Sequence, residues 1–124
     1  MSKLKVYHYP KCGTCRNALK WLQSAGHELE LTDIKEHPPG PEELRAIWKD
    51  SGLELKKLFN TSGEVYKSLG LKDKLPGMGE QEQLELLSGN GMLIKRPLVS
   101  DGSKATVGFK EDQYELEWGE KRHE

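Results

Sequence analysis

The stretch Cys12-Gly13-Thr14-Cys15 lies between an alternating apolar segment, residues 4–8, and a helical pattern that begins near Thr14. This junction decides which fold the first third of the chain is expected to adopt. Two thiols one helical turn apart, at the positive end of a helix dipole, can form a reactive thiolate with a resolving partner. The sequence contains no other cysteine, so we take this pair as the candidate redox centre.

A β-α-β unit is predicted around the two cysteines. Apolar residues alternate through a strand at about residues 3–8, which Pro10 ends. Apolar positions at steps of three and four then indicate a helix over about residues 14–25, closed by Gly26. A second alternating segment predicts a strand at about residues 28–33. The cysteines therefore fall at the first junction between a strand and a helix.

Several short helices are predicted in the middle of the chain. Pro41 is well placed in the first turn of a helix that ends at Gly52. Residues 53–90 contain short apolar groups separated by glycines, which is typical of short helices joined by turns. Within this segment we expect Ser62 to cap a helix that continues to Leu69.

A β-hairpin followed by a helix is predicted at the end of the chain. The apolar run Arg96-Pro97-Leu98-Val99 is separated from a second run, residues 105–109, by the turn signal Asp101-Gly102. Residues 111–118 then form a closing helix. The expected order is β-α-β, several helices, and β-β-α.

Composition and charge limit the classes of protein that this chain can represent. Its 124 residues, of which 35% are hydrophobic and 31% charged, suit a single domain over residues 1–124. A formal net charge of -1 argues against direct nucleic acid binding. No apolar run is long enough for a signal peptide or a membrane span, so we expect no membrane association. The few cysteines favour a reducing compartment and a cytoplasmic location.

The two thiols are expected to have different roles. Cys12 lies at the edge of the helix, where free N–H groups and the helix dipole lower the pKa of the thiol below its ordinary value near 8.5. Cys15, one turn inside, is more sheltered and suited to resolving a mixed disulfide. Lys11 and Arg16 flank the pair and add positive charge.

Two other interpretations of the cysteines stay open at this point. Both side chains could simply pack as small hydrophobic groups. They could also bind zinc together with His8 and one further ligand, either His27 or His37, although the sequence has no second cysteine pair. The spacing favours redox chemistry, for which we expect neither a metal nor an organic cofactor.

Three further residues are candidates for the same site. Pro97 begins the late strand, where thioredoxin-type folds carry a cis-proline beside their cysteines; an ordinary proline at the start of a strand is the alternative. Arg96 would bind an anion near Cys12 or lie in solvent. His8 would be a cation near Cys12 or a half-buried histidine with satisfied polar atoms.

The sequence resembles one known family over nearly its whole length. The stretch Tyr7-His8-x-Pro10-x-Cys12-Gly13-Thr14-x-Arg16-Asn17 is similar to the active-site loop of the glutaredoxin-coupled arsenate reductases. Three further segments are similar to segments of that family: Pro38-Pro39, Tyr66-x-x-Leu69-Gly70-Leu71 and Ile94-x-Arg96-Pro97-Leu98-Val99. The Spx/MgsR regulators share this architecture, and Val107-Gly108-Phe109-Lys110-Glu111-Asp112 resembles one of their segments.

The resemblance implies an α/β fold of the thioredoxin/glutaredoxin type, in which the β-α-β and β-β-α units form a mixed four-stranded sheet. The helices at about residues 41–90 would be an insertion in this fold. The implied activity is that of a thiol-dependent oxidoreductase, reducing oxidised or oxyanion substrates, in which Cys12 attacks and Cys15 resolves. His8 and Arg96 would support the anion at Cys12. The supporting or substrate-binding residues would be Gly13, Thr14, Arg16 and Pro97. An external thiol reductant, glutathione with glutaredoxin or a thioredoxin-type protein, would restore the dithiol.

Two departures from the reductase pattern shape the expected activity. The reductases use one catalytic cysteine and usually have serine at the position of Cys15. They hold the oxyanion with three arginines, of which Arg96 matches one. The other two positions are occupied by Asn60 and by either Phe109 or Lys110. The loss of two planar guanidinium clamps predicts a poor arsenate reductase.

The alternative function is that of a redox-sensing transcription regulator. In this Spx-like interpretation Cys12 and Cys15 form a disulfide switch, and Ser51-Gly52 contacts the C-terminal domain of the RNA polymerase α-subunit. Gly52 has a second explanation as the cap of a helix. The end of the chain also carries several glutamates where those regulators are basic. The sequence therefore favours the enzyme.

Overall fold

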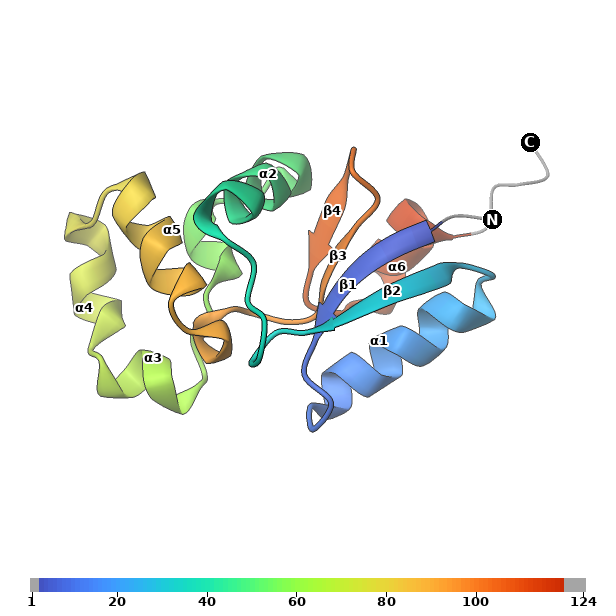
Figure 1. Cartoon of the computed structure of the whole chain (residues 1–124), viewed down its shortest axis with the longest axis horizontal. Helices are drawn as coiled ribbons and strands as arrows, with labels where there is room; N and C mark the ends of the chain where they lie inside the picture. The colour runs from blue at the N-terminus through green and yellow to red at the C-terminus, as the bar shows by residue number, and fades with distance from the viewer. Residues whose placement is uncertain (1–2, 120–124) are drawn as a thin grey trace.

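The computed structural model describes residues 3–119, and its centre is one mixed sheet with strand order β2-β1-β3-β4. The first two strands, β1 (Lys3–His8) and β2 (Glu28–Asp33), run parallel. Strand β3 (Leu98–Ser100) is antiparallel to β1, and β4 (Ala105–Val107) is antiparallel to β3. The predicted mixed four-stranded α/β sheet is thus confirmed, and Figure 1 shows its strands side by side.

Two helices cover one face of this sheet. They are α1 (Gly13–Ser24) and α6 (Glu111–Trp118). Their buried side chains and those of the strands beneath form one hydrophobic cluster: Leu4, Val6, Ala18, Leu22, Val99, Tyr114 and Trp118. Two buried hydrogen bonds fix α6 to the hairpin, because the Tyr114 hydroxyl donates to the Gly108 carbonyl at 3.0 Å and Trp118 Nε1 donates to Thr106 Oγ1 at 3.0 Å. The face that carries α1 is therefore closed by packed side chains.

The opposite face of the sheet is covered by the middle of the chain. Helix α2 (Pro41–Ser51) packs there, and its Leu44 and Ile47 join a second cluster that contains Tyr7 and Leu98 of the sheet. The Tyr7 hydroxyl also donates a hydrogen bond to a Glu43 carboxylate oxygen at 2.6 Å. Helix α2 thus covers the middle of this face, at Tyr7 and Leu98, while β2 at the edge of the sheet stays largely exposed.

The rest of the helical insertion, after α2, forms a lobe at the left of Figure 1. It contains short helical elements: η1 Leu55–Leu58, α3 Glu64–Ser68, α4 Leu71–Lys74, η2 Leu75–Gly77, α5 Glu80–Ser88 and η3 Gly91–Leu93. The prediction of several short helices is confirmed. Among the described residues, no helix combines the length and apolar character that crossing a lipid bilayer requires.

One cap in the insertion differs from the prediction. We expected Ser62 to begin the helix that became α3, but the N-cap is Gly63, which makes no side-chain capping bond. The Gly63 N–H instead donates to the Asn60 carbonyl at 3.0 Å, so a turn built on Asn60 starts the helix one residue later. A Cβ atom on Gly63 would lie only 2.6 Å from Asn60 Nδ2, which explains the glycine.

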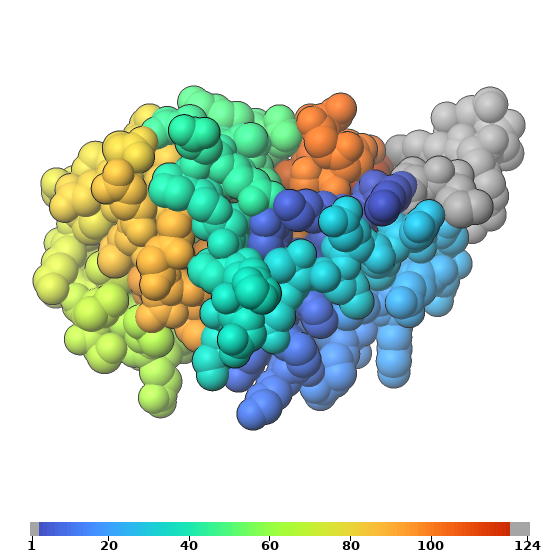
Figure 2. All heavy atoms as spheres, in the orientation of Figure 1, coloured from blue at the N-terminus to red at the C-terminus, as the bar shows by residue number. Residues whose placement is uncertain are grey.

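The insertion returns to the sheet beside the end of β2. Gly91 is buried against the Ile34 carbonyl, where a Cβ atom would overlap with the oxygen. Phe59 and Ile94 form an isolated antiparallel bridge. These contacts bring the segment before β3, which carries Lys95 and Arg96, back toward the cysteine loop. Figure 2 shows the cyan connector after β2 lying across the junction between the sheet and the insertion.

Candidate active site

Cys12 is the N-cap of helix α1, which begins at Gly13, one residue before the predicted start. Its N–H donates to the Tyr9 carbonyl at 2.9 Å, which closes the turn after β1. Its Sγ atom accepts the N–H of Cys15 at 3.4 Å. A thiol in this position meets the unpaired N–H groups and the positive end of the helix dipole. The helix terminus is therefore arranged to stabilise a thiolate at Cys12.

The half-buried Cys12 thiol has a lowered pKa. Burial alone would raise this pKa, but several interactions together outweigh it. They are the hydrogen bonds from the Cys15 N–H and the Cys15 thiol, the positive charge of Arg96, and the Thr14 N–H. Cys12 is thus the more acidic of the two thiols and the better nucleophile at neutral pH.

Cys15 has the opposite environment. Its side chain is fully buried in the first turn of α1, and burial raises the pKa of its thiol to about 12. The Tyr9 N–H, which donates to Cys15 Sγ at 3.5 Å, opposes this rise. A negative charge on Cys12 adds to it. Both cysteines are free in this structure, and Cys15 holds its proton more strongly than Cys12 does.

Arg96 supplies the cation of the site. Its Nη1 atom donates to the carbonyls of Ile94 at 3.2 Å and Met92 at 3.4 Å, and its guanidinium lies 5.3 Å from the centre of the Tyr9 ring. Its Nε atom is buried and finds no hydrogen-bond partner among residues 3–119. The next peptide bond, Arg96-Pro97, is cis, which decides between the two alternatives for Pro97. Arg96 is thus held in place through its Nη1 atom, while its buried Nε–H has no partner in the described part of the chain.

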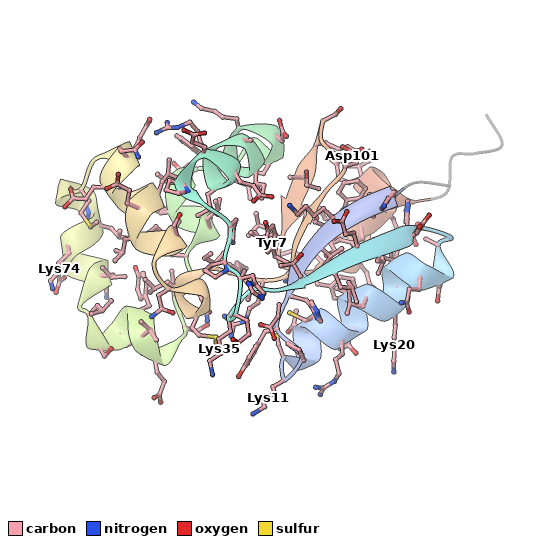
Figure 3. All side chains as sticks on the ribbon, viewed as in Figure 1. Tyr7, Lys11, Lys20, Lys35, Lys74 and Asp101 are labelled. Carbon is pink, nitrogen blue, oxygen red and sulfur yellow. The ribbon has the colours of Figure 1, made fainter. Side chains whose placement is uncertain are left out.

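The other charged candidates lie differently. His8 faces Asp33 across the β1–β2 register; burial lowers the pKa of His8 and the Asp33 charge opposes this. Its role at the Cys12 anion stays a prediction. Lys11 and Arg16 are exposed; Lys11 extends away from the loop in Figure 3, and Arg16 Nη1 donates to the Pro10 carbonyl at 3.1 Å. The charge that lowers the pKa of Cys12 therefore comes from Arg96, which is distant in sequence.

A pocket of about 330 Å³ opens beside the Cys12 thiol. Its lining comes from the cysteine loop, the insertion, the segment before β3 and the segment after β4. These residues are Cys12, Thr14, Asn60, Ser62, Lys95, Arg96, Val107, Gly108, Phe109 and Lys110. The positions that the resemblance pairs with the missing arginines are thus gathered around one thiol. Gly13 and Arg16 are outside this lining.

Ser62 and Lys95 are among the lining residues that had no role at the site from the sequence. Ser62 was expected as a helix cap, and Lys95 carried no signal except its place next to Arg96. Both enter the pocket because the insertion folds back onto the cysteine loop. The sequence signal that could have placed Ser62 at the site is a similarity to the reductases that extends over the loop around Asn60.

The zinc interpretation gains no support from the arrangement of possible ligands. Within residues 3–119, no group of three or more His, Cys, Asp or Glu side chains is arranged to hold a metal ion. His27 Nε2 instead lies 2.7 Å from the Trp118 carbonyl oxygen.

A parallel β-α-β unit, an antiparallel hairpin and a thiol at the N-terminus of α1 define a thiol oxidoreductase-like protein with a thioredoxin-like fold. The chain belongs to the ArsC family, whose sequence profile matches residues 7–116.

Individual relatives agree with this assignment. The chain is 61% identical over 115 residues to the uncharacterized protein YusI of Bacillus subtilis strain 168, covering 93% of this chain and 98% of YusI. It is 33% identical over 100 residues to an arsenate reductase of Acidiphilium multivorum, covering 80% of this chain and 69% of the reductase. The solution structure of SACOL0876 from Staphylococcus aureus COL superimposes with a TM-score of 0.83 and 48% identity, covering 91% of this chain and 96% of that one.

Gly52, which the regulator interpretation uses, has a local structural explanation. It ends α2 in the left-handed conformation with φ of 71°, and its N–H donates to the Lys49 carbonyl at 3.3 Å. Glycine is favoured at this position of a helix whether or not a partner contacts it. Binding to RNA polymerase stays a prediction from the resemblance.

Replacing Arg96 with glutamine is expected to slow alkylation of Cys12. The lost cation destabilises the thiolate and raises the pKa of the thiol, so less thiolate is present at neutral pH. We expect iodoacetamide to react about threefold more slowly at pH 7. Arg96→Lys, which keeps the charge, should retain most of the rate. Arg16→Gln, which removes the exposed arginine next to the cysteine pair, is the control. If it slowed the alkylation of Cys12 as much as Arg96→Gln does, this account would be contradicted.

Proposed function

We propose that this protein is a dithiol oxidoreductase that reduces disulfides with Cys12 as the attacking thiol and Cys15 as the resolving thiol. The observation that carries the proposal is the opposite environment of the two sulfur atoms. Cys12 is accessible with a lowered pKa, while Cys15 is buried with a pKa raised to about 12. This difference suits a reaction in which Cys12 attacks the substrate disulfide and Cys15 then resolves the mixed disulfide.

In the first step the Cys12 thiolate attacks one sulfur atom of a substrate disulfide. A bond forms between Cys12 Sγ and that sulfur, and the substrate S–S bond breaks. The leaving thiolate takes a proton from solvent. Arg96 and the N–H groups of α1 lie beside the reacting sulfur and can stabilise the negative charge as it passes between sulfur atoms.

In the second step Cys15 attacks Cys12 Sγ and releases the substrate as a thiolate. Once Cys12 is in a mixed disulfide, its negative charge is gone, and with it one cause of the raised pKa of Cys15. Loss of a proton from Cys15 to solvent therefore becomes easier at the stage when it is needed. The protein ends with a Cys12–Cys15 disulfide, having passed two electrons to the substrate.

An external thiol must then return two electrons to the protein. Glutathione with glutaredoxin, or a thioredoxin-type protein, is the proposed donor, since two thiols of the donor are oxidised to one disulfide in the exchange. The cycle needs no metal or organic cofactor, because every step is a thiol–disulfide exchange.

Arsenate is proposed as a poor substrate. A tetrahedral oxyanion in the pocket would meet the guanidinium of Arg96, whereas Asn60 offers a neutral amide and Lys95 and Lys110 one ammonium group each. None of these three side chains can replace the two parallel hydrogen bonds of an arginine. The second thiol and the smaller number of oxyanion-binding arginines both favour a disulfide substrate over an oxyanion substrate.

Replacing Asn60 with arginine is expected to raise arsenate turnover. The new guanidinium would enter the pocket beside Cys12 and add a charged, bidentate contact to the oxyanion, so we expect about a tenfold gain in kcat/KM. Turnover is measured with glutathione and glutaredoxin. Asn60→Gln, which keeps the amide, is the control and should leave it low. A wild-type protein that already turns over arsenate as fast as the Asn60→Arg variant would contradict the proposal.

The test of the function itself is reduction of a small neutral disulfide, hydroxyethyl disulfide, with glutathione and glutathione reductase. The wild-type protein should accelerate the reaction above the rate with glutathione alone. After the substrate is consumed in the absence of glutathione, mass spectrometry should find the chain two hydrogen atoms lighter. No acceleration, or no loss of the two hydrogens, would overturn the dithiol mechanism.

A further inference from the structure

A second pocket, of about 680 Å³, lies in the helical insertion. Its apolar lining includes Phe59 and Leu75, which are almost fully buried, and Tyr66, which packs against Phe59 with ring centres 6.3 Å apart. These side chains belong to the larger hydrophobic cluster or pack against it. The volume is in the range of ligand-binding pockets, and its floor is a fixed part of the fold.

Four lysines surround this apolar floor: Lys56, Lys57, Lys72 and Lys95. No aspartate or glutamate takes part in the lining. Within residues 3–119, none of the four ammonium groups forms an ion pair, whereas Lys5 and Lys104 pair with glutamates. The chain has nearly equal numbers of basic and acidic residues, 19 and 20, so a pocket that the described residues line with four lysines and no acidic residue departs from the average composition. We name this feature the lysine pocket.

The lysine pocket adjoins the pocket of the catalytic thiol. Lys95 lines both of them, because it lies in the segment between the insertion and β3, directly before Arg96. The loop of residues 59–62 also joins the two, since Phe59 and Thr61 line the lysine pocket while Asn60 and Ser62 line the pocket at Cys12. A ligand that is extended enough can occupy both at once.

We propose that the lysine pocket binds an acidic and apolar segment of a polypeptide substrate whose disulfide reacts at Cys12. This inference rests on the proposed function and names the class of substrate. Carboxylates of the segment would meet the unpaired lysines, and an aromatic or aliphatic side chain would cover Tyr66 and Met78, the partly buried apolar side chains of the lining. Extended polypeptides are commonly recognised in this way, by successive pockets along the chain.

The two kinds of contact would contribute differently. Burying an apolar side chain on the exposed part of the floor supplies binding free energy in proportion to the area removed from water. The lysines contribute less per contact because they are solvated, but they discriminate strongly against basic segments and accelerate encounter with acidic ones. The lysine pocket is therefore proposed to select a segment first by its negative charge and second by the size of its apolar side chains.

Binding is tested without any chemistry, in the Cys12→Ser/Cys15→Ser protein. Fluorescein-labelled peptides with alternating Glu and Phe, or alternating Lys and Phe, are titrated by anisotropy. The acidic peptide should bind at least about tenfold more tightly, with an affinity that falls as salt rises. Lys56→Glu/Lys72→Glu should weaken its binding about tenfold.

The matched control is Lys20→Glu/Lys74→Glu, which changes the net charge by the same amount. Both of its lysines are exposed, lie outside the lysine pocket and point outward in Figure 3, Lys74 on the same helix as Lys72. Binding should change less than twofold. Equal binding of the acidic and basic peptides would overturn the proposal. So would an equal loss in both double variants, since the effect would then be one of net charge alone.

A kinetic measurement tests whether the lysine pocket serves the thiol. Acidic and basic peptides that carry the same cysteine, as a mixed disulfide with thionitrobenzoate, are reduced by the protein with native cysteines, while glutathione restores its dithiol and the rate without protein is subtracted. The acidic substrate should have about a tenfold lower KM, and Lys56→Glu/Lys72→Glu should remove the difference. Tight binding without a difference in KM would overturn the link to Cys12. If neither peptide were reduced while the anisotropy result held, the proposed function would fail and the binding site would stand.

Discussion

Replacing Cys12 with serine is expected to lower the rate of disulfide reduction by about a thousandfold or more. A serine hydroxyl is not ionised near neutral pH, so the nucleophile of the first step disappears. The variant should still fold, because Cys12 is only half-buried and serine is a favoured N-cap residue that can accept the same N–H of Cys15. Turnover of hydroxyethyl disulfide with glutathione measures the effect.

The control for this result is the melting temperature of the Cys12→Ser protein, compared with that of the wild-type protein. If turnover is lost and the melting temperature is unchanged, the loss is due to the missing nucleophile and not to unfolding. Retention of more than about a tenth of the wild-type rate in a folded Cys12→Ser protein would show that the other thiol, or no thiol, carries the reaction.

Replacing Cys15 with serine is expected to trap the mixed disulfide at Cys12. An external thiol would then have to resolve the mixed disulfide in place of Cys15. This reaction is slower because the two reacting groups are no longer held next to each other. We expect multiple turnover at low glutathione to fall on the order of a hundredfold. The trapped adduct should be visible by intact mass spectrometry as the protein plus one half of the substrate.

Two controls separate trapping from misfolding of this buried site. Cys15→Ala removes the thiol without adding a buried hydroxyl and should trap the same adduct. Addition of excess dithiothreitol should release the substrate half from both variants and restore the free protein mass. Equal trapping in the wild-type protein, or no adduct in either variant, would remove Cys15 from the mechanism.

The sheet and its helices were largely predictable because their signals are local. The alternation of Leu4 and Val6 and the helical spacing of Ala18 and Leu22 correspond to buried positions in one hydrophobic cluster. The left-handed glycine after α2 followed from Gly52 alone. Ser62 was misassigned because a capping pattern cannot reveal the turn built on Asn60.

The electrostatics of the site were less predictable because they depend on contacts between distant segments. The sequence drew attention to Lys11 and Arg16, which are neighbours of the cysteines, but Lys11 extends away from the loop (Figure 3) and Arg16 donates to the Pro10 carbonyl. Arg96 is far along the chain and acts on Cys12 because the segment before β3 crosses the cysteine loop. The isomer of the Arg96-Pro97 bond was left open for the same reason. The lysine pocket had no signal, since Lys56 and Lys57 have acidic neighbours in the sequence, and only the fold brings them together with Lys72 and Lys95 around a lining that, within residues 3–119, has no acidic residue.

The most direct test of the central claim is an NMR titration of both cysteines, with 13C label at their Cβ atoms, from about pH 5 to about pH 10. The account predicts that Cys12 titrates below the ordinary value near 8.5, because its lowered pKa leaves thiolate present at lower pH. It predicts that Cys15, with a pKa raised to about 12, shows no titration of its own in this range. A Cys15 that titrates before Cys12, or a Cys12 that titrates at or above its ordinary value, would contradict the assignment of attacking and resolving thiols.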